Sequence, residues 1–260
     1  MKKTFILLAI FFLSFQLGAQ KFEGKGANSP EEAVSLYINA LKTCDYNQII
    51  SCYAVETLVD KYDISQYLIK MKCATPVMKM IYPKDNLLKQ TGKFEVLDQI
   101  SKMIKFQIWN LSDVNFLKTY STPQVKGNPQ EVIDQVFPSN AEKTLASIKF
   151  SNEFIRVEKF YMYLLVSDFS SDIAEYDEDI DTFVENQKNY HEQFKKIYGC
   201  DDIKDVAASF YLNEKEYFYF AETIKYGNKW YISPNQGYLA SILGLEIPKG
   251  CMTDAAEFER

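Results

Sequence analysis

The sequence predicts an α+β protein, with helices in its first half and an antiparallel β-sheet in its second half. Apolar residues recur at helical spacing between residues 29 and 110, which indicates helices with one buried face. After residue 145, short runs of β-branched and aromatic residues alternate with turn residues, a pattern typical of a strand meander. Two such runs meet at a Gly-Asn pair within the stretch 224–234. These patterns favour helices packed on an antiparallel sheet.

The first helix is predicted from the signals at its start. Ser29 is a good N-cap, Pro30 suits the first helical position, and Glu32 stands where a capping box needs an acid. Apolar residues then fall on one helical stripe: Val34, Tyr37, Ile38 and Leu41. We therefore expect a helix that begins at Pro30 and buries this stripe.

The helical pattern continues between residues 64 and 110, but two prolines interrupt it. Pro76 and Pro83 each lack an amide donor and disfavour helix in the residue before them. The sequence therefore predicts several helices here instead of one long helix. They form either an insertion in the main domain or a separate helical domain.

A long helix interrupts the strands of the second half at about residues 177–198. Its apolar stripe holds six residues: Ile180, Phe183, Val184, Tyr190, Phe194 and Ile197. The only histidine of the chain, His191, lies in this helix and belongs to no recognisable motif. Histidine is a common catalytic base, but without a motif we interpret His191 as a surface or packing residue.

The stretch 224–234 predicts a β-hairpin whose two faces are both apolar. With a type II′ turn at its centre, Lys225 pairs with Trp230 and Ile224 pairs with Tyr231. Because strand side chains alternate, aromatic or apolar residues then lie on both faces. A sheet with one face in water shows polar residues on that face. We therefore expect helices on one face, and another element, a ligand or a second subunit on the other.

Residues 1–19 have the pattern of a secretory signal peptide. Lys2 and Lys3 precede a short apolar run, and the small residue Ala19 marks the expected cleavage site. The run is shorter than the ~20 residues of a membrane helix. This favours a cleaved signal peptide over the alternative, an uncleaved N-terminal anchor. No cysteine follows the cleavage site, which disfavours a lipid anchor. We expect an exported protein, periplasmic or extracellular, with no stable membrane span after signal removal.

Charge and cysteine spacing argue against several classes of partner. The full chain has a net charge of -6, which becomes -8 when the two lysines of the signal peptide are removed. Nucleic-acid-binding proteins carry a basic face, whereas the densest charge run, residues 172–181, is acidic. The 5 cysteines form no CxxC pair, and their odd number leaves at least one thiol without an intramolecular partner. We predict no nucleic-acid partner, no metal site and no cofactor.

Two segments, 29–54 and 216–234, resemble the nuclear transport factor 2-like superfamily. The first holds the capped helix and a short helix that ends near the letters SCYA, and the second is the closing aromatic hairpin. The resemblance implies a cone-shaped fold in which a strongly curved antiparallel sheet wraps around the N-terminal helices. The signal peptide, which ends in the letters GAQ, resembles those of exported Bacteroidota proteins.

The resemblance also implies a domain organisation. After the signal peptide, residues 20–28 form a linker, and residues 29–235 form the nuclear transport factor 2-like domain. Within that domain, residues 64–110 are interpreted as a helical insertion, and residues 236–260 follow as a C-terminal tail. The late helix is a second addition to the minimal fold.

Members of this superfamily include isomerases, dehydratases and hydrolases that work inside the cone, and many binding modules without enzymatic activity. The resemblance implies an exported, non-catalytic module that holds a small hydrophobic ligand or a protein partner. The aromatic candidates for its ligand site are Trp230, Tyr231, Tyr219, Phe220 and Tyr37. The alternatives are an enzyme that uses the same pocket, and a structural homodimer formed through a sheet face without a ligand.

No catalytic residue is predicted. The chain has no serine-histidine-aspartate arrangement to propose, no GxSxG, no HExxH and no glycine-rich phosphate loop. Three acids in the second half, Asp202, Asp205 and Glu222, are the candidates for an inward-facing carboxylate. Each stands at a position where a solvent-facing carboxylate is expected.

Overall fold

The computed structural model describes residues 21–71, 86–111, 141–155, 180–235, 237–243, 245 and 250–257. The expected signal peptide, both interrupting prolines and Cys73 lie outside these residues. Most of the strand pattern expected between residues 154 and 169 lies outside them as well.

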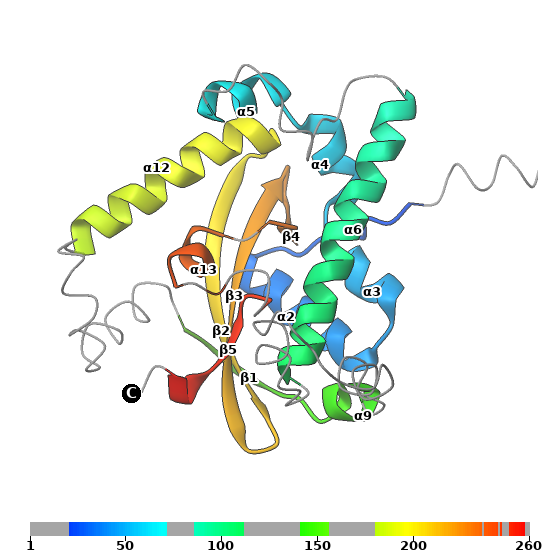
Figure 1. Cartoon of the computed structure of the whole chain (residues 1–260), viewed down its shortest axis with the longest axis vertical. Coiled ribbons are helices and arrows are strands. Elements are labelled where there is room, and N and C mark those ends of the chain that lie inside the picture. The colour runs from blue at the N-terminus through cyan, green and yellow to red at the C-terminus, as the bar shows by residue number, and fades with distance from the viewer. Residues whose placement is uncertain are drawn as a thin grey trace, which may run out of the picture.

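Helices come first and the sheet follows, as Figure 1 shows. The helices of the first half are α2 (Pro30–Thr43), α3 (Tyr46–Ser51), α4 (Val55–Lys61), α5 (Ile64–Met71), α6 (Asn86–Leu111) and α9 (Ala141–Ala146). The second half holds β1 (Lys149–Ile155), α12 (Ile180–Tyr198), β2 (Asp202–Leu212), β3 (Lys215–Tyr226) and β4 (Lys229–Ile232). The chain closes with α13 (Tyr238–Ile242), β5 (Met252–Asp254) and the 3₁₀ turn η2 (Ala255–Glu257).

The strands form one antiparallel sheet in the order β1-β2-β3-β4, with β5 also paired to β3. Strand β3 is central, because one of its edges pairs with β2 while the other pairs with β4 near its end and with β5 near its start. The sheet is strongly curled, and the N-terminal helices pack on it (Figure 1). The predicted α+β class, with helices on a strongly curved antiparallel sheet, is confirmed.

The hairpin between β3 and β4 has the predicted register. Ile224 pairs with Tyr231, and Lys225 pairs with Trp230. Gly227 has a φ of 60°, as the first central position of a type II′ turn requires, and glycine adopts this conformation without steric cost.

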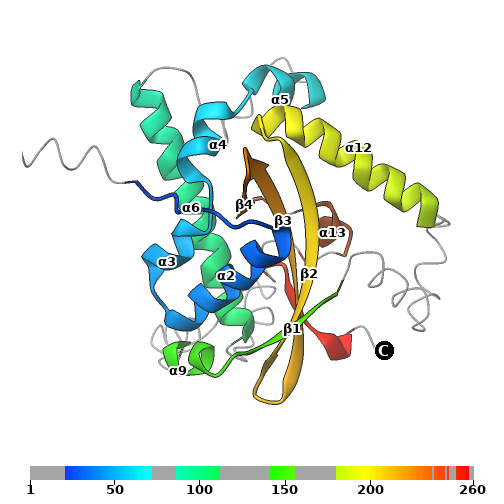
Figure 2. The same ribbon diagram turned by 180° about the vertical axis from the view of Figure 1, so that it is seen from behind.

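Both faces of the hairpin are covered, as predicted. The side chains of Trp230 and Tyr231 point to opposite faces, yet the residues are only 7% and 6% exposed. Helix α2 covers the face of Trp230, while α12 and α13 lie on the opposite side of the sheet (Figures 1 and 2). On that opposite side, the Tyr226 hydroxyl donates a hydrogen bond to the carbonyl of Tyr198 in α12. Elements of the same chain cover each face, so the hairpin needs no second subunit for burial.

The start of α2 has the predicted N-cap at Ser29, but the Glu32 carboxylate bonds one residue before the position that a capping box requires. The Ser29 hydroxyl accepts a hydrogen bond from the Glu32 amide at 3.1 Å, and the Glu32 carboxylate accepts one from the Asn28 amide at 2.7 Å. The first bond satisfies an amide that the helix start leaves without a partner, and the second fixes the residue before the cap. The predicted stripe of α2 is buried: Val34, Tyr37, Ile38 and Leu41.

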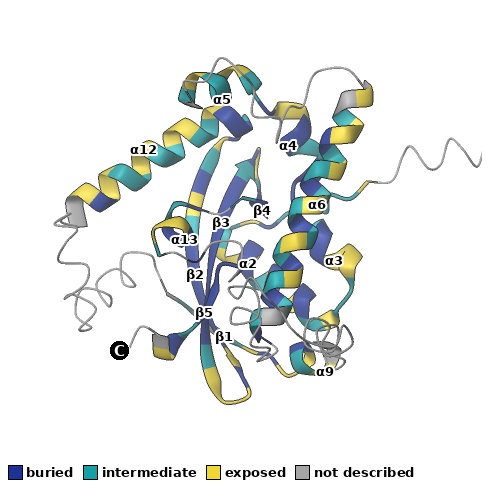
Figure 3. Cartoon of the chain, in the orientation of Figure 1, coloured by how far each residue is buried: buried dark blue, intermediate teal, exposed yellow. Residues whose placement is uncertain are grey.

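Helix α6 packs into the same core as α2 and the sheet. Its residues Val96, Ile100 and Ile104 are buried within one continuous hydrophobic cluster. Figure 3 shows buried residues along the strands and on the inner sides of the helices. The described part of the 64–110 region is therefore an integral layer of this domain and not an independent core. Helix α12 occupies the described part of the predicted late helix.

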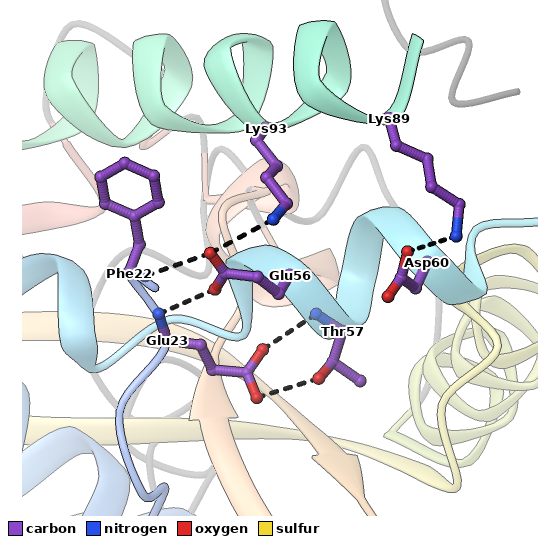
Figure 4. Close-up of polar contacts among 7 residues, drawn as sticks. All are labelled: Phe22, Glu23, Glu56, Thr57, Asp60, Lys89 and Lys93. Atoms are coloured by element: carbon purple, nitrogen blue, oxygen red, sulfur yellow. Dashed lines mark hydrogen bonds and ion pairs between the residues drawn. The ribbon is translucent and has the colours of Figure 1, made fainter. Parts of the chain in front are cut away.

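Hydrogen bonds hold the segment before α2 against α4 (Figure 4). The Glu56 carboxylate accepts hydrogen bonds from the amides of Phe22 and Glu23 at 3.1 and 2.8 Å. The Glu23 carboxylate in turn accepts from the amide and hydroxyl of Thr57, both at 2.9 Å. Further along, Ala27 exchanges two backbone hydrogen bonds with Trp230. Part of the segment assigned to a linker thus extends the sheet edge at β4.

Residues assigned to a C-terminal tail contribute to the sheet. Strand β5 pairs Met252 with Tyr219 and Thr253 with Phe218. The side chain of Gln107 in α6 donates to the carbonyl of Gly250 at 3.0 Å, so this region is also tied to the helical layer. The three-residue strand has too little periodicity to be recognised from sequence.

Candidate functional site

A cavity of about 360 Å³ opens where α5, α6 and α12 meet beyond the end of β4. Each of these elements, together with the ends of α4 and β4, contributes to its wall. The lining residues are Tyr62, Tyr67, Gln99, Lys102, Met103, Tyr190, Phe194, Tyr198, Pro234 and Asn235. Its size and its mainly apolar lining are typical of sites for small molecules.

The cavity wall combines aromatic rings with Gln99 and Asn235, two residues whose side-chain amides each have one buried atom without a partner. The rings of Tyr190 and Phe194 lie 4.2 Å apart between centroids. Gln99 Oε1 and Asn235 Nδ2 are both buried and have no hydrogen-bond partner. A buried polar group without a partner costs about 1–3 kcal/mol, so a ligand that hydrogen-bonds to these amides gains that energy.

Lys70 of α5 contacts two of these aromatic rings. Its ammonium nitrogen lies 3.5 Å from the ring centroid of Phe194 and 5.0 Å from that of Tyr190, within the range of cation–π attraction. Burial lowers the pKa of Lys70, and the nearby Glu222 carboxylate opposes this shift. The contact fastens α5 to α12.

A cluster of charged and polar side chains lies behind Tyr190, on the sheet. Asp205 of β2 and Glu222 of β3 are cross-strand partners, so their side chains lie on the same face. His191 of α12 places Nε2 3.0 Å from Asp205 Oδ2. Gln187 stands one helical turn earlier and donates to the same oxygen at 2.8 Å. Helix α12 therefore brings two polar side chains onto a pair of adjacent carboxylates.

Glu222 is the most confined member of this cluster. It is 2% exposed, and neither of its carboxylate oxygens has a hydrogen-bond partner. Burial first, and then the Asp205 charge, raise the pKa of Glu222 well above its usual value. Tyr190 and Ser233 lie near enough to act in the opposite direction, but neither makes a hydrogen bond of good geometry to it.

The expectation that these acids face solvent is wrong for two of the three. The side chain of Asp205 is 3% exposed and Glu222 is buried, whereas the side chain of Asp202 is 37% exposed. The sequence contains a signal for the burial of Glu222. This residue lies two positions before Ile224 in the strand, and therefore on a face that is already predicted to be covered. His191 is also more confined than expected of a surface residue, with a side chain 14% exposed.

The predicted aromatic site residues do not meet in one cavity. Tyr37 and Tyr219 stack with ring centroids 5.5 Å apart inside the core. Trp230 lines a separate hollow of about 330 Å³ beside α2. Tyr231 and Phe220 lie on the other face of the sheet, and none of the five lines the cavity between α5, α6 and α12.

Sequence comparisons identify no relative. No model of a known protein family matches the chain, and no curated protein matches it. Among solved structures, the chain is similar to a cystatin-like protein from Ruminococcus gnavus ATCC 29149, with 14% sequence identity and a TM-score of 0.44. The similarity covers 86% of this chain and 44% of that protein, so the chain spans less than half of its length.

Among the described helices, none combines the length and apolar character that a membrane span requires.

Proposed function

We propose that this protein is an exported binding module of the nuclear transport factor 2-like type. It holds a small, mainly aromatic or apolar molecule in the cavity between α5, α6 and α12. The fold class and the signal-peptide pattern support the type and the location. One observation carries the binding proposal: a cavity of about 360 Å³ is lined by aromatic rings and by Gln99 and Asn235, whose side-chain amides each have one buried atom without a partner.

The chemistry of the wall defines the class of ligand. Aromatic rings favour a flat, apolar body through stacking and burial. Asn235 Nδ2 needs an acceptor and Gln99 Oε1 needs a donor. The ligand therefore carries a hydroxyl, amide or amine group at its edge.

A binding module is favoured over an enzyme by the positions of the histidine and of the two confined acids. His191, Asp205 and Glu222 do not line the cavity. A general acid or base must lie within hydrogen-bond reach of the reacting atom, directly or through one water. The ionisable residues that do line the cavity are Lys102 and four tyrosines, and we assign them to recognition of the ligand.

A fluorescent probe tests this proposal. N-phenyl-1-naphthylamine is apolar, aromatic and carries one N–H group, so its emission should rise when it enters the cavity of the mature protein. Met103→Trp fills the cavity from α6 and should weaken probe binding by at least about tenfold, equivalent to 1.4 kcal/mol.

The matched control is Leu36→Trp, which adds a similar ring beside the second hollow next to α2. It should leave the affinity for the probe unchanged. Equal probe affinity in the parent and in Met103→Trp would place apolar binding elsewhere and would contradict the proposal. Native mass spectrometry of freshly purified protein would then reveal any natural ligand as added mass.

A further inference from the structure

The cluster behind Tyr190 has the composition and spacing of a metal site. His191, Asp205 and Glu222 each offer one ligand atom, and these atoms all lie within 4.8 Å of one another. They come from α12, β2 and β3, three elements that pack together in the fold. An imidazole nitrogen and two carboxylate oxygens are ligands that Zn²⁺ and related divalent ions accept.

Glu222 is the observation that separates this cluster from an ordinary group of acids. Surface carboxylates are normally solvated, whereas this one is buried with both oxygens unpartnered. The Lys70 ammonium is a nearby cation, but it makes no hydrogen bond to either oxygen. Burying a carboxylate with so little compensation is costly, and proteins usually pair such charges or use them to coordinate metals. One carboxylate oxygen of Glu222 lies within 4.8 Å of the ligand atoms of His191 and Asp205.

The separations between the three ligand atoms are close to those expected around one metal ion. Two ligands bound to one metal ion at 2.0–2.2 Å lie about 3–3.5 Å apart. His191 Nε2 and Asp205 Oδ2 already lie 3.0 Å apart. Because all three atoms lie within 4.8 Å of one another, a shift of less than about 2 Å by the Glu222 carboxylate brings them to the separation of metal ligands.

We propose that His191, Asp205 and Glu222 bind one divalent transition-metal ion of the Zn²⁺ class. The ion offsets the negative charge of the two neighbouring carboxylates, both of which are ionised when they act as ligands. His191 ligates through Nε2, and its ring proton resides on Nδ1 in that tautomer. Three protein ligands leave a coordination position for water, which can approach past the partly exposed His191 side chain.

Two further features support a built site. Gln187 donates a hydrogen bond to Asp205 Oδ2 at 2.8 Å, which orients that carboxylate as outer-shell partners of metal ligands do. Gly237 packs directly against the pair, because a Cβ atom at this position would collide with Asp205 Oδ1 and Glu222 Cβ. The absence of a side chain at Gly237 therefore leaves room for the two carboxylates.

Isothermal titration of the chelator-treated mature protein with Zn²⁺ tests the site. The parent should bind one ion per chain. Glu222→Gln removes a charged ligand with little change of shape, and His191→Gln removes the imidazole, so each should abolish the saturable one-to-one signal. Asp202→Asn makes the same charge change on β2 at a partly exposed carboxylate and should leave the signal intact.

Gln187→Ala supplies a readout that does not depend on losing a ligand. Removal of an outer-shell partner should weaken Zn²⁺ affinity by about 10–100-fold without changing the stoichiometry. Circular dichroism melting establishes that each variant is folded before titration. In the parent, Zn²⁺ should raise the melting temperature, and in Glu222→Gln it should not.

Two results would overturn the proposal. The first is a parent protein that binds no Zn²⁺. The second is a one-to-one signal that survives in Glu222→Gln and His191→Gln, as binding by cysteine thiolates would. The proposal does not depend on the proposed function, because the naphthylamine probe reports on the cavity and Zn²⁺ titration reports on the cluster. Either measurement can fail while the other succeeds.

Discussion

At the scale of single residues, burial lowers the expected reactivity of two cysteine thiols. Cys200 and Cys251 are both buried, and burial raises the pKa of each thiol to about 12. The thiolate is the reactive form of cysteine. No disulfide joins Cys44, Cys52, Cys200 and Cys251 to one another. The expectation of at least one unbridged thiol per chain therefore agrees with the described cysteines.

We predict that Cys200 and Cys251 resist alkylation in the folded protein. At pH 8, a thiol with a pKa of about 8.5 is about one quarter thiolate, whereas one with a pKa of about 12 is ionised in roughly one molecule in 10⁴. Labelling by iodoacetamide should therefore be about 10³-fold slower than in urea, as peptide mass spectrometry can measure. Similar rates in folded and unfolded protein would show that these thiols are accessible and ionised as usual.

At the scale of elements, local hydrogen bonds determine where α2 begins. The Ser29 hydroxyl satisfies the Glu32 amide, which the helix cannot satisfy internally, and the Glu32 carboxylate holds the Asn28 amide before the cap. Pro30 follows at the first helical position, where its missing amide hydrogen costs nothing. Acids in the first turn also complement the positive end of the helix dipole. The start of α2 depends on residues that are neighbours in sequence.

We predict that Ser29→Ala lowers the free energy of unfolding by about 1 kcal/mol, because the mutation removes the acceptor of the Glu32 amide. The shift of the urea midpoint measures this change. Ser65→Ala, at an exposed serine of α5, is the matched control and should change stability by no more than about 0.5 kcal/mol. Coinciding midpoints for Ser29→Ala and the parent would mean that water or another group satisfies the helix start.

At the scale of the whole molecule, the sheet is enclosed from both sides by one chain. The core is continuous from α2 and α6 to the strands and the inner face of α12. The two ends of the described chain reinforce the same sheet, because Ala27 bonds to β4 and β5 pairs with β3. Coverage of both faces therefore explains the aromatic hairpin without reference to a partner.

We predict that Trp230→Ala and Tyr231→Ala each destabilise the protein by about 3–5 kcal/mol, because each removes a buried ring from one covered face. Tyr211→Ala is the control in the same sheet, since Tyr211 is 42% exposed, and it should cost far less, as at ordinary surface sites. Denaturant unfolding measures all three. A small effect at either buried residue would contradict the coverage of that face.

The sequence by itself determined the features that depend on short-range chemistry. The cap at Ser29, the stripe of α2 and the hairpin register follow from residues within a few positions of one another, because helix and strand periodicities are local. The α+β class follows from the order of those patterns. The two apolar hairpin faces also required coverage, although the sequence did not identify the covering elements.

Only the tertiary structure decided the location of the cavity and of the acid–histidine cluster. The cavity needs α5 and α6 together with α12, which lies far from both in the chain, and none of the three carries a motif for it. Glu222 looked solvent-facing because a charged residue in a strand is normally exposed, yet the packing of α12 and Gly237 confines it. Strand pairing placed Asp205 opposite Glu222, and helix packing placed His191 above them. These long-range contacts, and not any local pattern, create the sites proposed for the ligand and the metal ion.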